Sequence, residues 1–142
     1  MEKKMSVLML LLLTALLWGT APILEKTGLR NTTPLIAITI RSLGITSALI
    51  ITLALTGRIK QLINTESKTV IIFIISGIMA GLFGMWTYFA ALKSGATSKV
   101  VPIAACYPLV TALLSVLILK ENVTLARLIG TSLIIAGVWL VK

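Results

Sequence analysis

Five long apolar stretches constrain the fold of this chain more than any other feature. They cover residues 5–24, 34–55, 70–92, 100–119 and 123–141, and nearly all charged residues lie between them. A bilayer core about 30 Å thick is crossed by a helix of about 20 apolar residues. A soluble fold would instead need a polar shell, which 12% charged residues in 142 cannot supply. The sequence therefore predicts an all-α membrane protein with five transmembrane helices in one domain, residues 1–142.

The first stretch also has the basic start of a secretory signal peptide, with small residues at 19–21 where cleavage could occur. We favour an uncleaved first span, because the stretch is longer than a usual signal core and four further spans follow. Seven Lys and Arg then lie on the side of the N-terminus and five on the other. This small excess favours a cytoplasmic N-terminus in the cell (plasma or inner) membrane, and it also agrees with insertion in both orientations.

The composition excludes several classes of function. The net charge is +9, but the Lys and Arg are spread over the loops without a basic block, as expected for anchors at lipid headgroups and not for a nucleic-acid surface. The chain has no His, no Asp and a single cysteine, Cys106, so we expect no metal site, no cofactor and no disulfide. Because no acid, base or ligand set lies within the spans, we do not expect an enzyme.

Arg41 is the only charged residue in the second stretch. At about 1.5 Å per residue it lies about 10 Å below the membrane surface, where an unpaired guanidinium costs about 3 to 10 kcal/mol or more. It shares a helix face with small residues, Ala37, Gly44 and Ala48, so we expect it to face protein or a cavity. The acidic residue that follows the first stretch, Glu25, is either solvated at the interface or paired with Arg41, and we favour solvation.

Four aromatic residues fall at a depth comparable to that of Arg41. Together with Arg41 they form the candidate substrate pathway: Trp18, Arg41, Trp86, Tyr88 and Tyr107. Such a set fits a cavity for an organic anion or a flat amphipathic solute. The alternative is an interfacial aromatic belt with a snorkelling arginine. We favour the belt for Tyr88 and the cavity for Arg41 and Trp18.

Glycines and prolines suggest where helices pack and bend. Gly77, Gly81 and Gly84 share one face of the third stretch at helical spacing, and we favour close packing against another helix over a ligand role for them. Three prolines remove backbone hydrogen bonds within spans and are candidate hinges, with a harmless kink as the equal alternative. They are Pro22, Pro102 and Pro108.

We read residues 56–69 as a solvated loop, the alternative being a short amphipathic turn at the interface.

Three segments together carry a resemblance to a known family: "LLWGTAPILEKTGL", "LIAITIRSLGI" and "CYPLVTALLSVLILKENVTLARLIGTSLIIAGVWLV". In their order and spacing they are similar to one EamA unit of the drug/metabolite transporter superfamily. The most specific part is the last, with a proline-bearing span, a tight turn at Glu121 and a helix containing Gly130. The Trp18–Gly19 pair and Arg41 also match the family pattern.

The resemblance implies transport of small metabolites, such as amino acids or nucleosides, by alternating access. Most relatives contain two such units, inverted relative to each other because each has five spans. We therefore expect a half-size exporter or exchanger, one half of an inverted-repeat transporter, that pairs in the bilayer with an inverted second copy or with a homologous chain.

Two alternatives to this function stay open. The first is a drug antiporter like the related small multidrug resistance proteins, which depend on a glutamate within their first helix. The corresponding stretch here, "LLLLTALLWGT", has no acid, which argues against proton-driven export of cationic drugs. The second alternative is a non-transporting membrane subunit of a larger complex.

Overall fold

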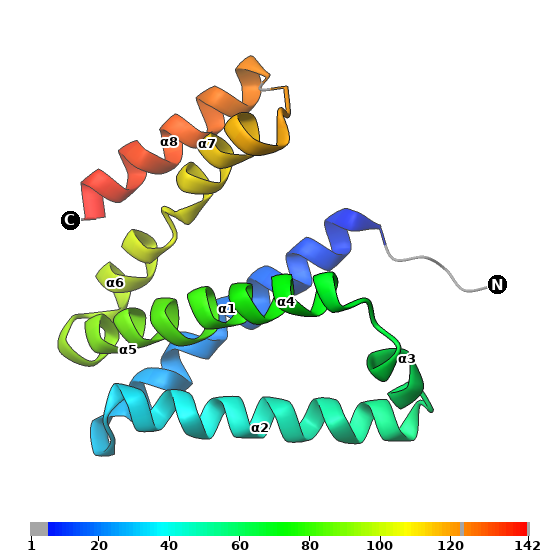
Figure 1. The fold of residues 1–142 in the computed structure, drawn as a ribbon. Helices are drawn as coiled ribbons and strands as arrows, with labels where there is room; N and C mark the ends of the chain where they lie inside the picture. Colours follow the sequence, from blue (N-terminus) through cyan, green and yellow to red (C-terminus); the bar gives the residue numbers. More distant parts are fainter. Residues whose placement is uncertain (1–5, 123, 142) are drawn as a thin grey trace. The chain divides into compact units, whose positions relative to one another are not determined.

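The structure is a computed structural model that describes residues 6–122 and 124–141. These residues form helices connected by short turns, and no strand occurs among them. They divide after Lys93 into two compact units, whose elements follow one another along the chain in Figure 1.

The first unit contains seven consecutive helical segments. They are α1 (Val7–Gly28), the short 3-10 helix η1 (Leu29–Asn31), α2 (Pro34–Leu55), α3 (Ile59–Ile63), α4 (Ser67–Ser76), the π-helix η2 (Gly77–Gly84) and α5 (Met85–Ser94). Side-chain oxygens cap the first two long helices, because Ser6 accepts from the amide of Met9 and Thr33 from the amide of Ile36. Pro34 suits the first position of α2, where no backbone N–H is needed.

Among the residues that the structure describes, four helical stretches are long and apolar enough to cross a membrane: Val7–Asn31, Pro34–Leu55, Ser67–Ser94 and Thr97–Leu119. The second matches the predicted span at both ends. The first continues past its predicted end at Leu24, so Glu25 and Lys26 lie in the last turn of α1 and not in a loop. The helix continues because both are good helix formers, whereas the sequence-based boundary followed hydrophobicity alone.

The predicted fifth span corresponds to α8 (Leu125–Val141), which has 17 residues. It is apolar but shorter than the other four, and position 123, where the prediction began, lies outside the described residues. The structure therefore supports four spans, and a fifth crossing stays a prediction.

The loop predicted for residues 56–69 instead contains a helical turn, α3. It exposes Ile59, Leu62 and Ile63, the residues of the amphipathic alternative. Gly57 adopts a φ of 67° in the turn that precedes α3, a conformation that glycine accepts without strain.

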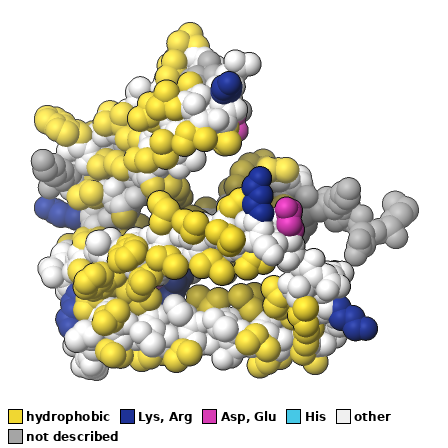
Figure 2. Space-filling model, in the orientation of Figure 1, with side chains coloured by type: hydrophobic (Ala, Val, Ile, Leu, Met, Phe, Trp, Pro, Cys, Tyr) yellow, Lys and Arg dark blue, Asp and Glu magenta, His cyan; other side chains and the backbone are white. Residues whose placement is uncertain are grey.

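The core of the first unit is small and lies at one end. Its buried apolar residues come from the end of α1 and η1, the start of α2 and from α5: Pro22, Leu29, Ile38, Phe89 and Leu92. Most other large apolar side chains are exposed, as the face in Figure 2 shows. Such exposure has no hydrophobic cost in a bilayer, because lipid tails are as apolar as the side chains themselves.

The second unit contains α6 (Thr97–Ala104), α7 (Tyr107–Leu119) and α8. The fourth span is thus broken at Ala105 and Cys106. Pro108 lies in the first turn of α7 and has no N–H to continue the hydrogen bonds of α6. Of the three candidate hinge prolines, Pro22 and Pro102 lie inside uninterrupted helices, whereas Pro108 follows the break directly.

Candidate functional site

A groove of about 440 Å³ lies between α2 and the α4–η2 segment of the first unit, and Figure 2 shows the surface hollowed there. One wall combines hydroxyl and apolar side chains of α2: Ile38, Thr39, Ser42, Leu43 and Thr46. The other wall is glycine and aliphatic: Ile74, Gly77, Ile78, Gly81 and Leu82. The groove is therefore mostly apolar, with a few polar groups on one side, as is typical of sites for small organic molecules.

The glycine wall belongs to a π-helix, a rare conformation that often marks functional sites. Because a π turn takes more residues than an α turn, Gly77 and Gly81 stay on one face while Gly84 moves away from it. A Cβ atom added at Gly77 or Gly81 would meet no atom within 4 Å. No helix of the described residues packs closely on these two glycines, so the predicted packing role stays a prediction for a contact with another chain.

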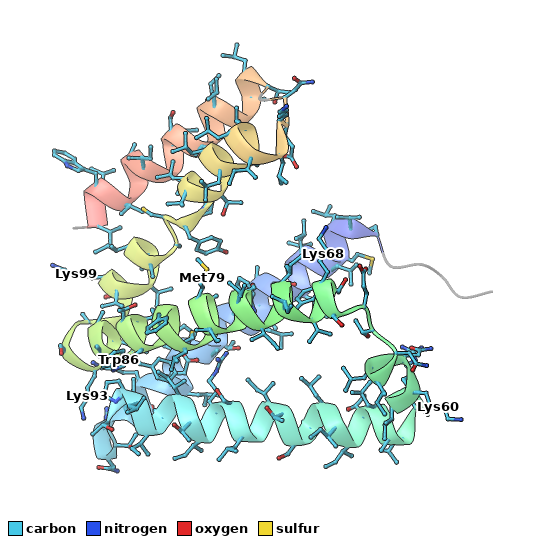
Figure 3. The ribbon with its side chains drawn as sticks, in the orientation of Figure 1. Lys60, Lys68, Met79, Trp86, Lys93 and Lys99 are labelled. Atoms are coloured by element: carbon cyan, nitrogen blue, oxygen red, sulfur yellow. The ribbon has the colours of Figure 1, made fainter. Side chains whose placement is uncertain are left out.

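Met79, also in η2, lies on the side that faces away from α2 (Figure 3).

The hydroxyl wall offers free hydrogen-bonding groups. Thr39 donates to the carbonyl of Leu35 one turn earlier, at 3.0 Å, as many threonines do in membrane helices. Ser42 and Thr46 have no such bond within residues 6–122 and 124–141. Their hydroxyls are therefore available to a molecule in the groove, as donors and as acceptors.

Arg41 lies on the face of α2 that meets α1, and it is not among the residues that line the groove. Its Nε lies 3.6 Å from Oε1 of Glu25, whose side chain is only 13% exposed, whereas that of Arg41 is 44% exposed. The expectation that Glu25 is simply solvated was wrong, because the longer α1 brings its carboxylate up to α2. Tyr88 of α5 lies close enough to interact electrostatically with Glu25.

Two lysines connect the helix ends around the core. Lys26 Nζ donates to the carbonyls of Leu92 and Lys93 at 2.6 and 3.1 Å, and Lys93 Nζ donates to the carbonyl of Thr32 at 2.6 Å. The carbonyls that end a helix have no partner within it, and they attract cations. These bonds hold the end of α5 against α1 and the α1–α2 connection. In Figure 3, Lys93 lies at this end of the unit and Lys60 at the other.

We expect the variant Lys26→Met to lower the free energy of unfolding by about 1.5 to 3 kcal/mol, because it leaves carbonyls at the end of α5 without a charged donor. Thermal or denaturant unfolding of the purified protein in detergent measures this loss. The matched control is Lys60→Met on exposed α3, with an expected change within about 0.5 kcal/mol. Equal losses in the two variants would contradict the structural role of Lys26.

The predicted pathway residues occupy different places. Arg41 and Tyr88 both lie near Glu25. Trp18 and Trp86 are exposed on α1 and α5, and Tyr107 belongs to the second unit, where it begins α7. None of these five residues is among those that line the groove.

The family of the chain follows from a comparison over nearly its whole length. The model of the EamA-like transporter family matches residues 5–142. The chain belongs to this family. The match runs across both units and includes the groove, the Glu25–Arg41 pair and α8.

Two archaeal relatives extend the comparison. An uncharacterized protein of Methanocaldococcus jannaschii is 34% identical over 131 residues, which are 92% of each chain. An uncharacterized transporter of Archaeoglobus fulgidus is 29% identical over 76 residues, which are 54% of this chain and 27% of the relative. Since 76 residues make up 27% of that transporter, it is about twice as long as the present chain. No solved structure matches the chain.

Family membership and the apolar helices together establish a multi-pass membrane protein of a transporter family. This confirms the resemblance in its general form, and a family of transporters agrees with the expectation that the chain is not an enzyme.

Sequence reasoning missed the hydroxyl wall of the groove. Thr39, Ser42 and Thr46 recur at spacings of three and four, a signal that was present in the sequence. The face chosen instead, through Ala37, Arg41, Gly44 and Ala48, is the other side of α2. Small residues made that face conspicuous, but the neighbouring helix that forms the second wall was not known.

Proposed function

We propose that this EamA-family chain is one half of a carrier that moves small organic solutes across the cell membrane by alternating access, with the α2–η2 groove as part of the solute pathway. The observation that carries the proposal is the open groove in a chain of a transporter family. A solute in it would meet hydroxyls of α2 on one side and the smooth glycine face of η2 on the other.

The proposal needs a second half because the described residues enclose no route of their own. Their buried apolar side chains gather at one end of the first unit, and the groove stays open along its length. A related transporter about twice as long has room for two such halves. In a half-size protein, the second half comes from an inverted second copy or from a homologous chain of opposite orientation.

We propose that each copy of the chain crosses the membrane five times, with α8 as the fifth crossing. The two termini then lie on opposite sides of the membrane, with the N-terminus cytoplasmic in one of the two orientations. The seven-to-five distribution of Lys and Arg supports mixed insertion, because neither set of loops holds a strong excess of positive charge.

Labelling of the termini tests this arrangement. In a Cys106→Ser background, Glu2→Cys and Lys142→Cys each introduce one thiol for a membrane-impermeant maleimide applied to intact cells. We expect each terminus to be labelled in part, and completely only after lysis. Labelling of a single terminus contradicts the inverted copy and leaves the homologous chain as the partner. If both termini lie on one side in every molecule, the fifth crossing is wrong.

A further inference from the structure

The Glu25–Arg41 pair leaves most of the guanidinium group uncommitted. At 3.6 Å, the Nε–Oε1 contact is longer than a hydrogen bond, and no hydrogen bond joins the two described side chains. Arginine has five N–H donors in a planar fork, and its strong pairs with carboxylates use two of them in parallel. Glu25 is the only ion-pair partner of Arg41 among the residues that the structure describes. The terminal edge of the guanidinium is therefore open to a second anion.

The position of Arg41 makes an unfilled edge costly. Its side chain is 44% exposed although the residue lies about 10 Å inside the second span. A guanidinium edge that faces lipid loses its hydration without compensation. An edge that faces a solute pathway has water, or the solute itself, as its partner. The second arrangement explains why α2 carries an arginine at this depth.

The charges around Arg41 favour an anion over a cation. Glu25 is the one acid there, whereas Arg41 and the neighbouring Lys26 are both cationic. The ammonium of Lys26 donates to the carbonyls of Leu92 and Lys93. An anion at the open edge of Arg41 is attracted by its charge, and a planar carboxylate matches the fork of the guanidinium.

We infer that Arg41 binds the carboxylate of an organic monoanion, which takes over from Glu25 as the principal partner of the guanidinium. The inference rests on the proposed function, since it names the class of solute that the carrier accepts. Glu25 then acts as a competitor that holds Arg41 while no solute is present. Removal of Arg41 weakens carboxylate binding, and removal of the charge of Glu25 strengthens it.

Paired probes that differ only in charge test the inference. The purified full-length protein is titrated in detergent with three carboxylates and with their neutral amides: N-acetylglycine, benzoate and hexanoate, against N-acetylglycinamide, benzamide and hexanamide. We expect at least one carboxylate to raise the unfolding temperature more than its amide does. Arg41→Gln should lower the affinity for that carboxylate about tenfold or more, as the loss of a charged hydrogen bond implies.

Glu25→Gln should raise the same affinity, because the competing carboxylate is gone. The matched control is Arg30→Gln, which removes the charge of an exposed side chain in η1 and should leave the affinity unchanged. Opposite effects of Arg41→Gln and Glu25→Gln on the affinity for the carboxylate separate a binding role from a structural one. If the ion pair were purely structural, either variant would lower the stability of the protein equally.

Three results overturn the inference. Carboxylates and amides behave alike in every pair, or Arg41→Gln leaves the difference intact, or Arg41→Gln lowers stability in phosphatidylcholine vesicles by an amount that added carboxylate does not change. The last result assigns Arg41 a structural role, with Glu25 or a lipid phosphate as its partner. Solute movement in reconstituted vesicles tests the proposed function separately: if solutes move although carboxylates and amides behave alike in every pair, the carrier stands and the carboxylate site does not. If no solute moves although carboxylates bind, the reverse holds.

Discussion

Gly81→Leu is expected to reduce solute movement in reconstituted vesicles about tenfold or more, because the leucine side chain fills space in the groove and a loss of only about 1.4 kcal/mol in binding is tenfold. Gly81 lines the groove from η2, and an added Cβ atom there meets nothing within 4 Å. The leucine therefore fits the fold of the isolated chain and occupies the space intended for the solute. Uptake by proteoliposomes, normalised to the amount of inserted protein, measures the loss.

The matched control for this variant is Gly130→Leu on α8, which is equally free of close neighbours and should keep its transport if only the groove matters.

Mixtures of wild-type and Gly81→Leu chains also report on pairing. If each carrier needs two intact halves, activity falls with the square of the wild-type fraction, whereas independent chains give a linear fall. Wild-type uptake by the Gly81→Leu protein would show that the groove lies outside the pathway.

Phe89→Ala is expected to destabilise the protein by about 3 to 5 kcal/mol, the range for removing a buried aromatic side chain. Phe89 is 2% exposed and lies in the small core where α1, α2 and α5 meet. Because few other residues of the first unit are buried, the structure has little else to hold this end closed. Unfolding by denaturant in detergent micelles measures the change.

The chain offers a matched control for this effect in the same span. Phe73 of α4 is 72% exposed, so Phe73→Ala removes the same atoms without opening a cavity and should change stability by about 0.5 kcal/mol or less. A large difference between the two variants supports the core that the structure shows. Similar losses from both would mean that Phe73 is buried against another chain, and would locate the contact with the second half at α4.

The positions of the spans were largely predictable because each helix in a bilayer must satisfy its own backbone and cover about 30 Å with apolar residues. These are local requirements, so hydrophobicity alone found α2 to the residue. Hydrophobicity failed where the ends of a helix do not coincide with the ends of an apolar stretch. It ended α1 before Glu25, joined α6 to α7 across the break before Pro108, and gave no sign of the π-helix η2.

The candidate site was predictable only in part. Composition drew attention to Arg41, since a charge in an apolar span is costly wherever it lies. The partner of Arg41 could not be predicted without knowing the course of α1, which brings Glu25 within 3.6 Å of Arg41. The groove also needed two helices at once, because the hydroxyls of Ser42 and Thr46 gain a role only when η2 lies opposite them.

The sequence by itself thus determined that the chain is a multi-pass helical membrane protein of a transporter family, because burial in lipid depends on the content of each segment and not on its neighbours. Only the tertiary structure decided which faces meet: Lys26 with the end of α5, Glu25 with Arg41, and α2 with η2 across a groove. In a bilayer, apolar faces gain nothing from contact with each other over contact with lipid. Hydrophobic patterning therefore cannot specify these pairings, and the shapes and polar groups of the individual residues do.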